Sequence, residues 1–115
     1  LAGVLADGVL LDAGFTVAGA QEAVDACRAA HKAAGRTDAF EVAIYERYYR
    51  GADAASQLTG EARPEGLLAN ASPAEAAERV REFAAAGVQT VVFMPSAAEP
   101  DPADFLRTIA ADVVP

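Results

Sequence analysis

The sequence predicts an α/β domain in which amphipathic helices cover a sheet of parallel strands. Three short segments rich in apolar, β-branched or aromatic residues are typical of strands, at positions 8–11, 40–49 and 88–94. The segments that alternate with them carry apolar residues at helical spacing, and this alternation favours a parallel sheet. The length of 115 residues suffices for one hydrophobic core. We therefore expect residues 1–115 to form a single domain, or part of one.

The first strand is predicted at Gly8–Leu11, which is too short and too evenly apolar for a half-exposed strand or a helix. It stops at Asp12, Ala13 and Gly14, and parallel α/β folds place their ligands at such strand ends. The preceding Leu1–Leu5 has the composition of the end of a helix. Because the chain begins with leucine rather than methionine, we expect it to be a fragment of a longer protein.

A helix is predicted over Ala18–Ala34, with Thr16 as its cap and Gly35 at its end. The second strand is predicted at Phe40–Tyr49, with the sequence FEVAIYERYY. Because side chains alternate along a strand, Glu46 and Arg47 are expected on opposite faces near its C-terminal end.

The longest irregular connection is predicted at 51–71, with a short helix at 52–58. After it, Ser72-Pro73-Ala74-Glu75 has the pattern of a capping box and begins a helix that ends at Gly87. The third strand follows at Val88–Met94. Asp101-Pro102 then begins a last helix, whose predicted packing face is Phe105, Leu106, Ile109 and Ala110.

Charge and composition exclude several classes of function. Nine Lys and Arg against 17 Asp and Glu leave a net charge of −8, which disfavours nucleic-acid binding because that affinity comes from clustered cations. No apolar run approaches the roughly 20 residues that span a bilayer. One cysteine cannot form an internal disulfide, which fits a reducing compartment. We expect a cytoplasmic protein with no membrane partner.

The order and spacing of these segments resemble a known family. LAGVLADGVLL, a helix that ends in AAGR, the strand FEVAIYERYY and a proline-initiated helix that leads into FAAAGVQTVVFMP together resemble the C-terminal part of the luciferase-like flavin-dependent oxidoreductases. That family folds as a TIM (β/α)8 barrel and includes monooxygenases that use FMN and enzymes that use the deazaflavin coenzyme F420. The resemblance makes 8–11, 40–48 and 88–94 its sixth, seventh and eighth strands.

The resemblance implies an oxidoreductase that transfers a hydride or activates oxygen on a small organic substrate, with either FMN or coenzyme F420. The family's first five strands, including the turn that holds the flavin phosphate, have no counterpart in this chain. Three strands cannot close a barrel, because closure fixes strand number and stagger together. We therefore expect an incomplete barrel that is inactive alone, and that forms a homo-oligomer or pairs with the missing barrel half.

In such barrels the active site lies at the C-terminal ends of the strands. Asp12 and Gly14 are predicted to bind the cofactor, because a carboxylate can accept a hydrogen bond and a glycine lets a ligand approach the backbone. Arg47 with Tyr48 is predicted to bind the substrate, through an anionic group and an aromatic ring. The alternatives are a plain turn at 12–14 and solvated charges at the end of the second strand.

Other arrangements of reactive residues give only weak indications of a functional site. Cys27 and His31 lie four residues apart on one helix, a spacing that two metal ligands can use, but no second pair accompanies them. We expect both to have structural roles and no metal to bind. A different class of function also fits the chain, namely a small non-catalytic α/β module that self-associates or pairs with another chain through its open sheet edges.

Overall fold

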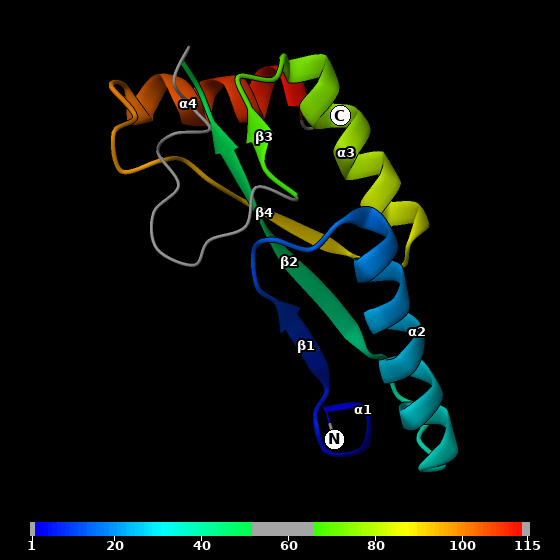
Figure 1. Ribbon diagram of the computed structural model, residues 1–115. Coiled ribbons are helices and arrows are strands. Elements are labelled where there is room, and N and C mark those ends of the chain that lie inside the picture. Colours follow the sequence, from blue (N-terminus) through cyan, green and yellow to red (C-terminus); the bar gives the residue numbers. More distant parts are fainter. Residues whose placement is uncertain (1, 52–65, 114–115) are drawn as a thin grey trace.

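The computed structural model describes residues 2–51 and 66–113 (Figure 1). It shows a parallel α/β fold with an open sheet, which confirms the predicted fold class. In chain order the elements are α1 (Ala2–Leu5), β1 (Gly8–Leu11), α2 (Val17–Ala33), β2 (Glu41–Tyr49), β3 (Leu68–Ala69), α3 (Pro73–Ala85), β4 (Thr90–Met94), α4 (Pro102–Thr108) and the π-helix η2 (Ile109–Val113).

Strand β2 is the centre of the sheet. Strand β1 pairs with its first half, from Gly8 beside Glu41 to Leu11 beside Ile44. Strand β4 pairs with β2 from Ala43 to Arg47, on the side away from β1, and both pairings are parallel. The C-terminal ends of β1, β2 and β4 therefore point the same way, which is the arrangement that the predicted strand-end site requires.

Strand β3 was not predicted. Its two residues, Leu68 and Ala69, pair in parallel with Tyr48 and Tyr49 at the end of β2. Two residues are too few to give a periodic signal, so the sequence alone left them in an irregular connection. Residues 52–65 of that connection, which include the short helix predicted at 52–58, lie outside the described residues.

The main hydrophobic core lies between one face of the sheet and two helices. Along β2 the side chains alternate, so that Val42 and Ile44 are buried while their neighbours are more exposed. Figure 1 shows α2 and α3 along the same side of the sheet. The buried members of this core are Leu11, Ala20, Val24, Phe40, Val42, Ile44, Phe83 and Val88. We call this side of the sheet the helix-covered face.

A second core lies at the C-terminal end of β2, beneath α4 and η2. Its buried members are Tyr48, Leu68, Ala76, Phe105 and Val113. The predicted packing face of the last helix was only partly right, because Leu106 is 66% exposed and Ala110 is exposed. Phe105 and Ile109 are four residues apart and share the inward side, whereas the residue after each is turned about 100° away around the helix.

The predicted helix starts are confirmed in detail. The Thr16 hydroxyl accepts from the Gly19 amide, at 3.0 Å, at the start of α2. At the start of α3 the Ser72 hydroxyl accepts from the Glu75 amide, and the Glu75 carboxylate accepts from the Ser72 amide, which completes the capping box. No helix in the described part of the chain is both long and apolar enough to cross a membrane.

Candidate functional site

The candidate site lies on the sheet face opposite the helix-covered face. Residues that pair in parallel strands point to the same side, so the register sets Leu10 beside Ala43, Val92 beside Tyr45 and Met94 beside Arg47. We call this the open face, with members Leu10, Ala43, Tyr45, Arg47, Tyr49, Val92 and Met94. Leu10 is 51% exposed and Val92 is 38% exposed, so no described helix covers this face.

Arg47 is the cation of the open face. It is half-buried near the C-terminal end of β2, two residues from Tyr45 and two from Tyr49 on the same side of the strand. Within residues 2–51 and 66–113, its side chain takes part in no hydrogen bond or ion pair. A guanidinium group of this kind can bind a carboxylate or a phosphate through two parallel hydrogen bonds.

Tyr48 lies on the helix-covered face, away from Arg47. Its side chain is buried, and its hydroxyl donates to the Ala71 carbonyl oxygen at 2.7 Å. Its ring packs against Phe93 and Phe105, with centroid distances of 5.9 and 5.8 Å. Burial raises the pKa of the Tyr48 phenol. The structure therefore does not bring the predicted substrate pair together, and the tyrosines beside Arg47 are Tyr45 and Tyr49.

Asp12 and Gly14 form the turn that follows β1. Asp12 is exposed, and its carboxylate accepts from the Ala13 amide at 2.8 Å. Gly14 has a φ of 105°, a conformation that side chains rarely adopt, so the turn needs glycine. The requirements of the turn are therefore enough to explain an aspartate at position 12 and a glycine at position 14. The contacts also leave Asp12 in solvent at the same end of the sheet as Arg47.

The turn after β1 is in contact with Gly66, which leads into β3. A Cβ atom built on Gly66 would lie 2.4 Å from the Phe15 carbonyl oxygen, so the two backbones touch. Gly66 in turn accepts a hydrogen bond from Arg79 of α3, whose Nη1 lies 3.4 Å from the Gly66 carbonyl oxygen. The loop that carries Gly14 is thus connected to α3 through one backbone contact.

Glu46 is a buried acidic residue on the helix-covered face, and it is bonded to Arg79, the same arginine that contacts Gly66. Its carboxylate accepts from Arg79 Nη1 at 3.0 Å, and its side chain is 2% exposed. Burial raises the pKa of Glu46 to about 7, against the opposing effect of Arg79 and a smaller one of Arg47. Strand alternation predicted opposite faces for Glu46 and Arg47, but nothing in the sequence pattern pointed to Arg79 as the partner.

Arg50, at the end of β2, is engaged in the structure. It forms ion pairs with the buried Glu99 and with Asp104, at 3.1 Å from the latter, and its guanidinium lies 5.3 Å from the centre of the Phe105 ring. It therefore joins β2 to α4. Among the described residues, the donors of Arg50 are thus engaged, whereas those of Arg47, three residues earlier, are free on the open face.

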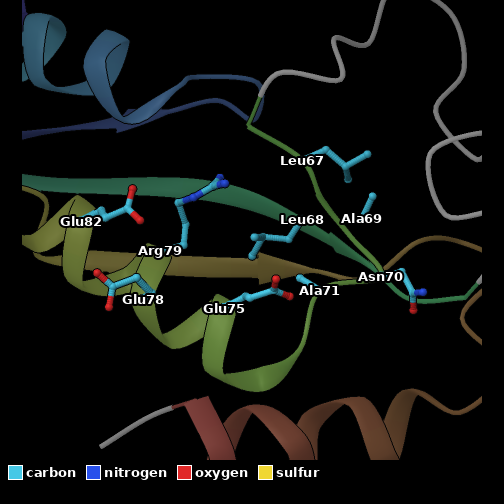
Figure 2. Close-up of a pocket in the computed structure, with 9 residues that line it drawn as sticks. All are labelled: Leu67, Leu68, Ala69, Asn70, Ala71, Glu75, Glu78, Arg79 and Glu82. Atoms are coloured by element: carbon cyan, nitrogen blue, oxygen red, sulfur yellow. The ribbon is translucent and has the colours of Figure 1, made fainter.

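A groove of about 430 Å³ lies between β3 and α3. Figure 2 shows Leu67 to Ala71 on one side and the side chains of Glu75, Glu78, Arg79 and Glu82 on the other. The groove is on the helix side of the sheet, apart from the predicted site residues. In the described part of the chain, no three His, Cys, Asp or Glu side chains are grouped so that they could hold a metal ion.

His31 and Cys27 lie on α2, far along the chain from the strand ends. His31 is buried, with Nδ1 3.2 Å from the Gly3 carbonyl oxygen and Nε2 2.8 Å from that of Asp38. Cys27 is half-buried and packs against the main core. Both ring nitrogens of His31 are occupied, so the histidine joins α1, α2 and the turn before β2.

Comparison with known proteins shows the fold alone. No family model matches the sequence, and no curated protein matches it. The structure is similar to that of the coenzyme F420-dependent tetrahydromethanopterin reductase from Methanopyrus kandleri, with a TM-score of 0.67 and 19% sequence identity. The match covers 97% of this chain and 46% of the reductase chain. This chain therefore spans about half the length of the reductase chain that it matches, and its sheet of parallel strands is open.

Proposed function

We propose that the chain is the C-terminal portion of an oxidoreductase that uses coenzyme F420 or FMN on a small organic substrate. The observation that carries this proposal is the structural match over 97% of the chain to a reductase named for its dependence on coenzyme F420. The strand ends support it, because the C-terminal ends of barrel strands form the active site in TIM-barrel enzymes.

Asp12 and Gly14 lie on the cofactor side of the proposed site. Arg47 lies on the substrate side, where its guanidinium binds an anionic group of the substrate or of the cofactor. Tyr45 and Tyr49 flank Arg47 and offer rings for a planar ligand. Tyr48 contributes from the other face, where its hydrogen bond to Ala71 fixes the end of β2 and hence the place of Arg47. A cation between two phenols fits a ligand that is both aromatic and anionic.

The bound cofactor would supply hydride transfer, and FMN would also allow oxygen activation. The residues of this chain bind and orient the cofactor and the substrate. Arg47 neutralises negative charge on the ligand, and Asp12 accepts a hydrogen bond from a polar N–H or O–H group. The missing strands hold the rest of the pocket, so the chain alone is inactive.

The open face is covered by the remaining barrel half, supplied by a longer polypeptide or by another chain. Strands β1 and β4 each leave an edge that no described strand occupies, and such edges are templates for pairing. Val4 and Leu5 of α1, the helix that precedes β1 in the chain, are 43% and 72% exposed. A second identical copy would double a net charge of −8, which opposes self-association.

A titration with coenzyme F420 and, separately, with FMN tests the proposal through quenching of cofactor fluorescence. We expect saturable binding of one cofactor, weakened at least tenfold by Arg47→Ala. Arg81→Ala is the matched control, because Arg81 is an exposed arginine of α3 that pairs with Glu78, away from the strand ends. Quenching that does not saturate, or that both variants reduce equally, would contradict the proposal.

The second candidate function is a non-catalytic module that associates through the open face. The exposure of Leu10 and Val92 favours it. Sedimentation of the chain without cofactor distinguishes the two functions: a stable dimer that binds neither cofactor supports the module.

A further inference from the structure

The connection between β4 and α4, residues 95–101, begins at the end of the strand that lies beside Arg47. Met94 is the last residue of β4, and in the register of the sheet it is paired with Arg47. The loops that follow the strands form the active site in TIM-barrel enzymes. The 95–101 loop therefore borders the proposed site on the side of Arg47, just as the turn after β1 borders it on the other side of β2.

Hydrogen bonds within the 95–101 loop give it a definite shape. The Ser96 hydroxyl accepts from the Ala98 amide, and the Ser96 carbonyl oxygen accepts from the Glu99 amide, both at 3.1 Å. These bonds close a turn directly after the strand, in which Ser96 is buried. The Glu99 carboxylate accepts from the amide of Asp101 at 3.4 Å, so Glu99 connects this turn to the N-cap of α4.

Arg50, the residue that follows β2, attaches the 95–101 loop to the end of that strand. Its Nε donates to the Glu99 carboxylate, its Nη1 to that of Asp104 at 3.1 Å, and its Nη2 to the Asp101 carbonyl oxygen at 3.5 Å. The guanidinium also lies 5.3 Å from the centre of the Phe105 ring, which belongs to the second core. One side chain at the end of β2 therefore contacts the loop, the cap of α4 and α4 itself.

Glu99 is the member of this group that needs a cation. Its side chain is 4% exposed, whereas that of Asp104 is 52% exposed. An ionised carboxylate is costly to bury without a partner, and removing one member of a buried ion pair leaves the other uncompensated. In the part of the chain that the structure describes, the cation paired with Glu99 is Arg50. Without Arg50, the loop is therefore expected to open until water reaches Glu99.

We propose that Arg50 is a positioning residue that holds the 95–101 loop closed beside Arg47 and so shapes the substrate side of the site. Arg50 does not contact the ligand, because its donors are engaged with the loop and with α4. Its effect on binding passes through Glu99 and the turn that begins at Ser96. The effect on ligand binding rests on the proposed function, whereas the attachment of the loop does not.

The first measurement is NMR relaxation of the chain without cofactor, at the amides of Ala98, Glu99 and Asp101. In Arg50→Gln, the order parameters of these amides are expected to fall from about 0.85, typical of a rigid backbone, to below about 0.6. In the double variant Arg50→Gln/Glu99→Gln they are expected to recover, because a neutral amide is far less costly to bury than an uncompensated carboxylate.

The second measurement is the affinity for coenzyme F420 and, separately, for FMN, by quenching of cofactor fluorescence. For the cofactor that binds, Arg50→Gln is expected to weaken binding about three- to tenfold, and the double variant to return to within about twofold of the wild type. A role of Arg50 that depended only on Phe105 or Asp104 would not be rescued by a change at Glu99. Rescue in the double variant therefore identifies the buried ion pair as the cause.

Two further variants complete the experiment. Arg107→Gln is the matched control, because Arg107 is a 68% exposed arginine of α4 that pairs with the same Asp104 at 3.9 Å, and it is expected to behave as wild type. Arg50→Lys keeps a cation for Glu99 and is also expected to keep the loop closed. If Arg50→Gln does not fold, Arg50→Lys and the double variant are still expected to fold and to bind as wild type.

Three results would contradict the positioning role of Arg50. They are loop amides that stay ordered in Arg50→Gln, a double variant whose loop remains open, and a loop that opens with no change in cofactor affinity. If the wild-type chain binds neither cofactor, the proposed function fails. The relaxation data then still decide whether Arg50 holds the loop through Glu99, so the two failures are distinguishable.

Discussion

Glu46 and Arg47 are consecutive residues of β2 whose charged side chains lie on opposite faces of the sheet. Glu46 is 1% exposed and bonded to Arg79, whereas Arg47 is half-buried on the open face and, among the described residues, unpaired. At this strand end, Glu46 therefore has a partner within the fold, whereas Arg47 is available to a ligand. The predictions below test these two roles and the contacts around them.

The stability of the chain is expected to fall as the pH rises from 5 to 8, because of Glu46. The folded chain keeps the Glu46 proton up to a pKa of about 7, while the unfolded chain loses it near 4.5. Stability from this group is therefore fully present below pH 4.5 and lost as pH rises through 7, at up to roughly 1 kcal/mol per pH unit. Urea unfolding at several pH values measures it. Glu46→Gln removes the slope, and an equal slope in that variant would show that another group causes it.

Removing the Tyr48 hydroxyl is expected to reduce the stability of the chain more than its affinity for the cofactor. Tyr48→Phe leaves the Ala71 carbonyl oxygen without its donor, which costs roughly 1 to 2 kcal/mol of unfolding free energy. Arg47→Ala is expected to change stability by less than about 0.5 kcal/mol, because Arg47 has no described partner to lose. Thermal unfolding of the two variants, compared with their cofactor affinities, separates the structural role of Tyr48 from the binding role of Arg47. A large loss of stability in Arg47→Ala would mean that Arg47 has a structural role.

Alanine at Gly66 is expected to be far more harmful than alanine at Gly35. Both glycines have positive φ, 81° and 76°, so both substitutions carry a conformational cost of about 1 kcal/mol. A Cβ at Gly35 meets no atom of the described residues within 4 Å, whereas a Cβ at Gly66 meets the Phe15 carbonyl oxygen at 2.4 Å. We expect a loss of roughly 2 to 4 kcal/mol for Gly66→Ala in chemical unfolding. Equal costs at the two glycines would contradict the contact between Gly66 and Phe15.

The second candidate function, a module that associates through the open face, predicts that charged residues on this face prevent association without unfolding the chain. Leu10→Lys and Val92→Lys place an ammonium where 51% and 38% of the native side chains are already exposed. We expect a lower apparent mass in sedimentation and an unchanged circular dichroism spectrum. Leu106→Lys is the control, since Leu106 is 66% exposed on α4 and lies outside the open face. Equal effects of all three would indicate general hydrophobic association.

Local chemistry in the sequence predicted most of the fold. The capping box at Ser72 and Glu75, the cap at Thr16 and the apolar strand at Gly8–Leu11 are all set by neighbouring residues, and all are present. Strand alternation likewise placed Glu46 and Arg47 on opposite faces.

Long-range contacts could not be predicted in the same way. The pairing of Glu46 with Arg79 joins residues 33 positions apart, and β3 exists only because Leu68 and Ala69 meet the end of β2. Alternation also separates Tyr48 from Arg47, although both are near the same strand end. Proximity in sequence suggested that they act together, whereas the packing of Tyr48 beneath α4 decides its environment.

The most direct test of the proposed site is an NMR titration of the chain with coenzyme F420 and, separately, with FMN, followed at every backbone amide. The proposed function predicts saturable shifts that centre on Asp12, Gly14 and Arg47 and that weaken at least tenfold in Arg47→Ala. Shifts confined to the groove lined by Leu67, Glu78 and Glu82, or no saturable shifts at all, would contradict a cofactor site at the C-terminal ends of the strands.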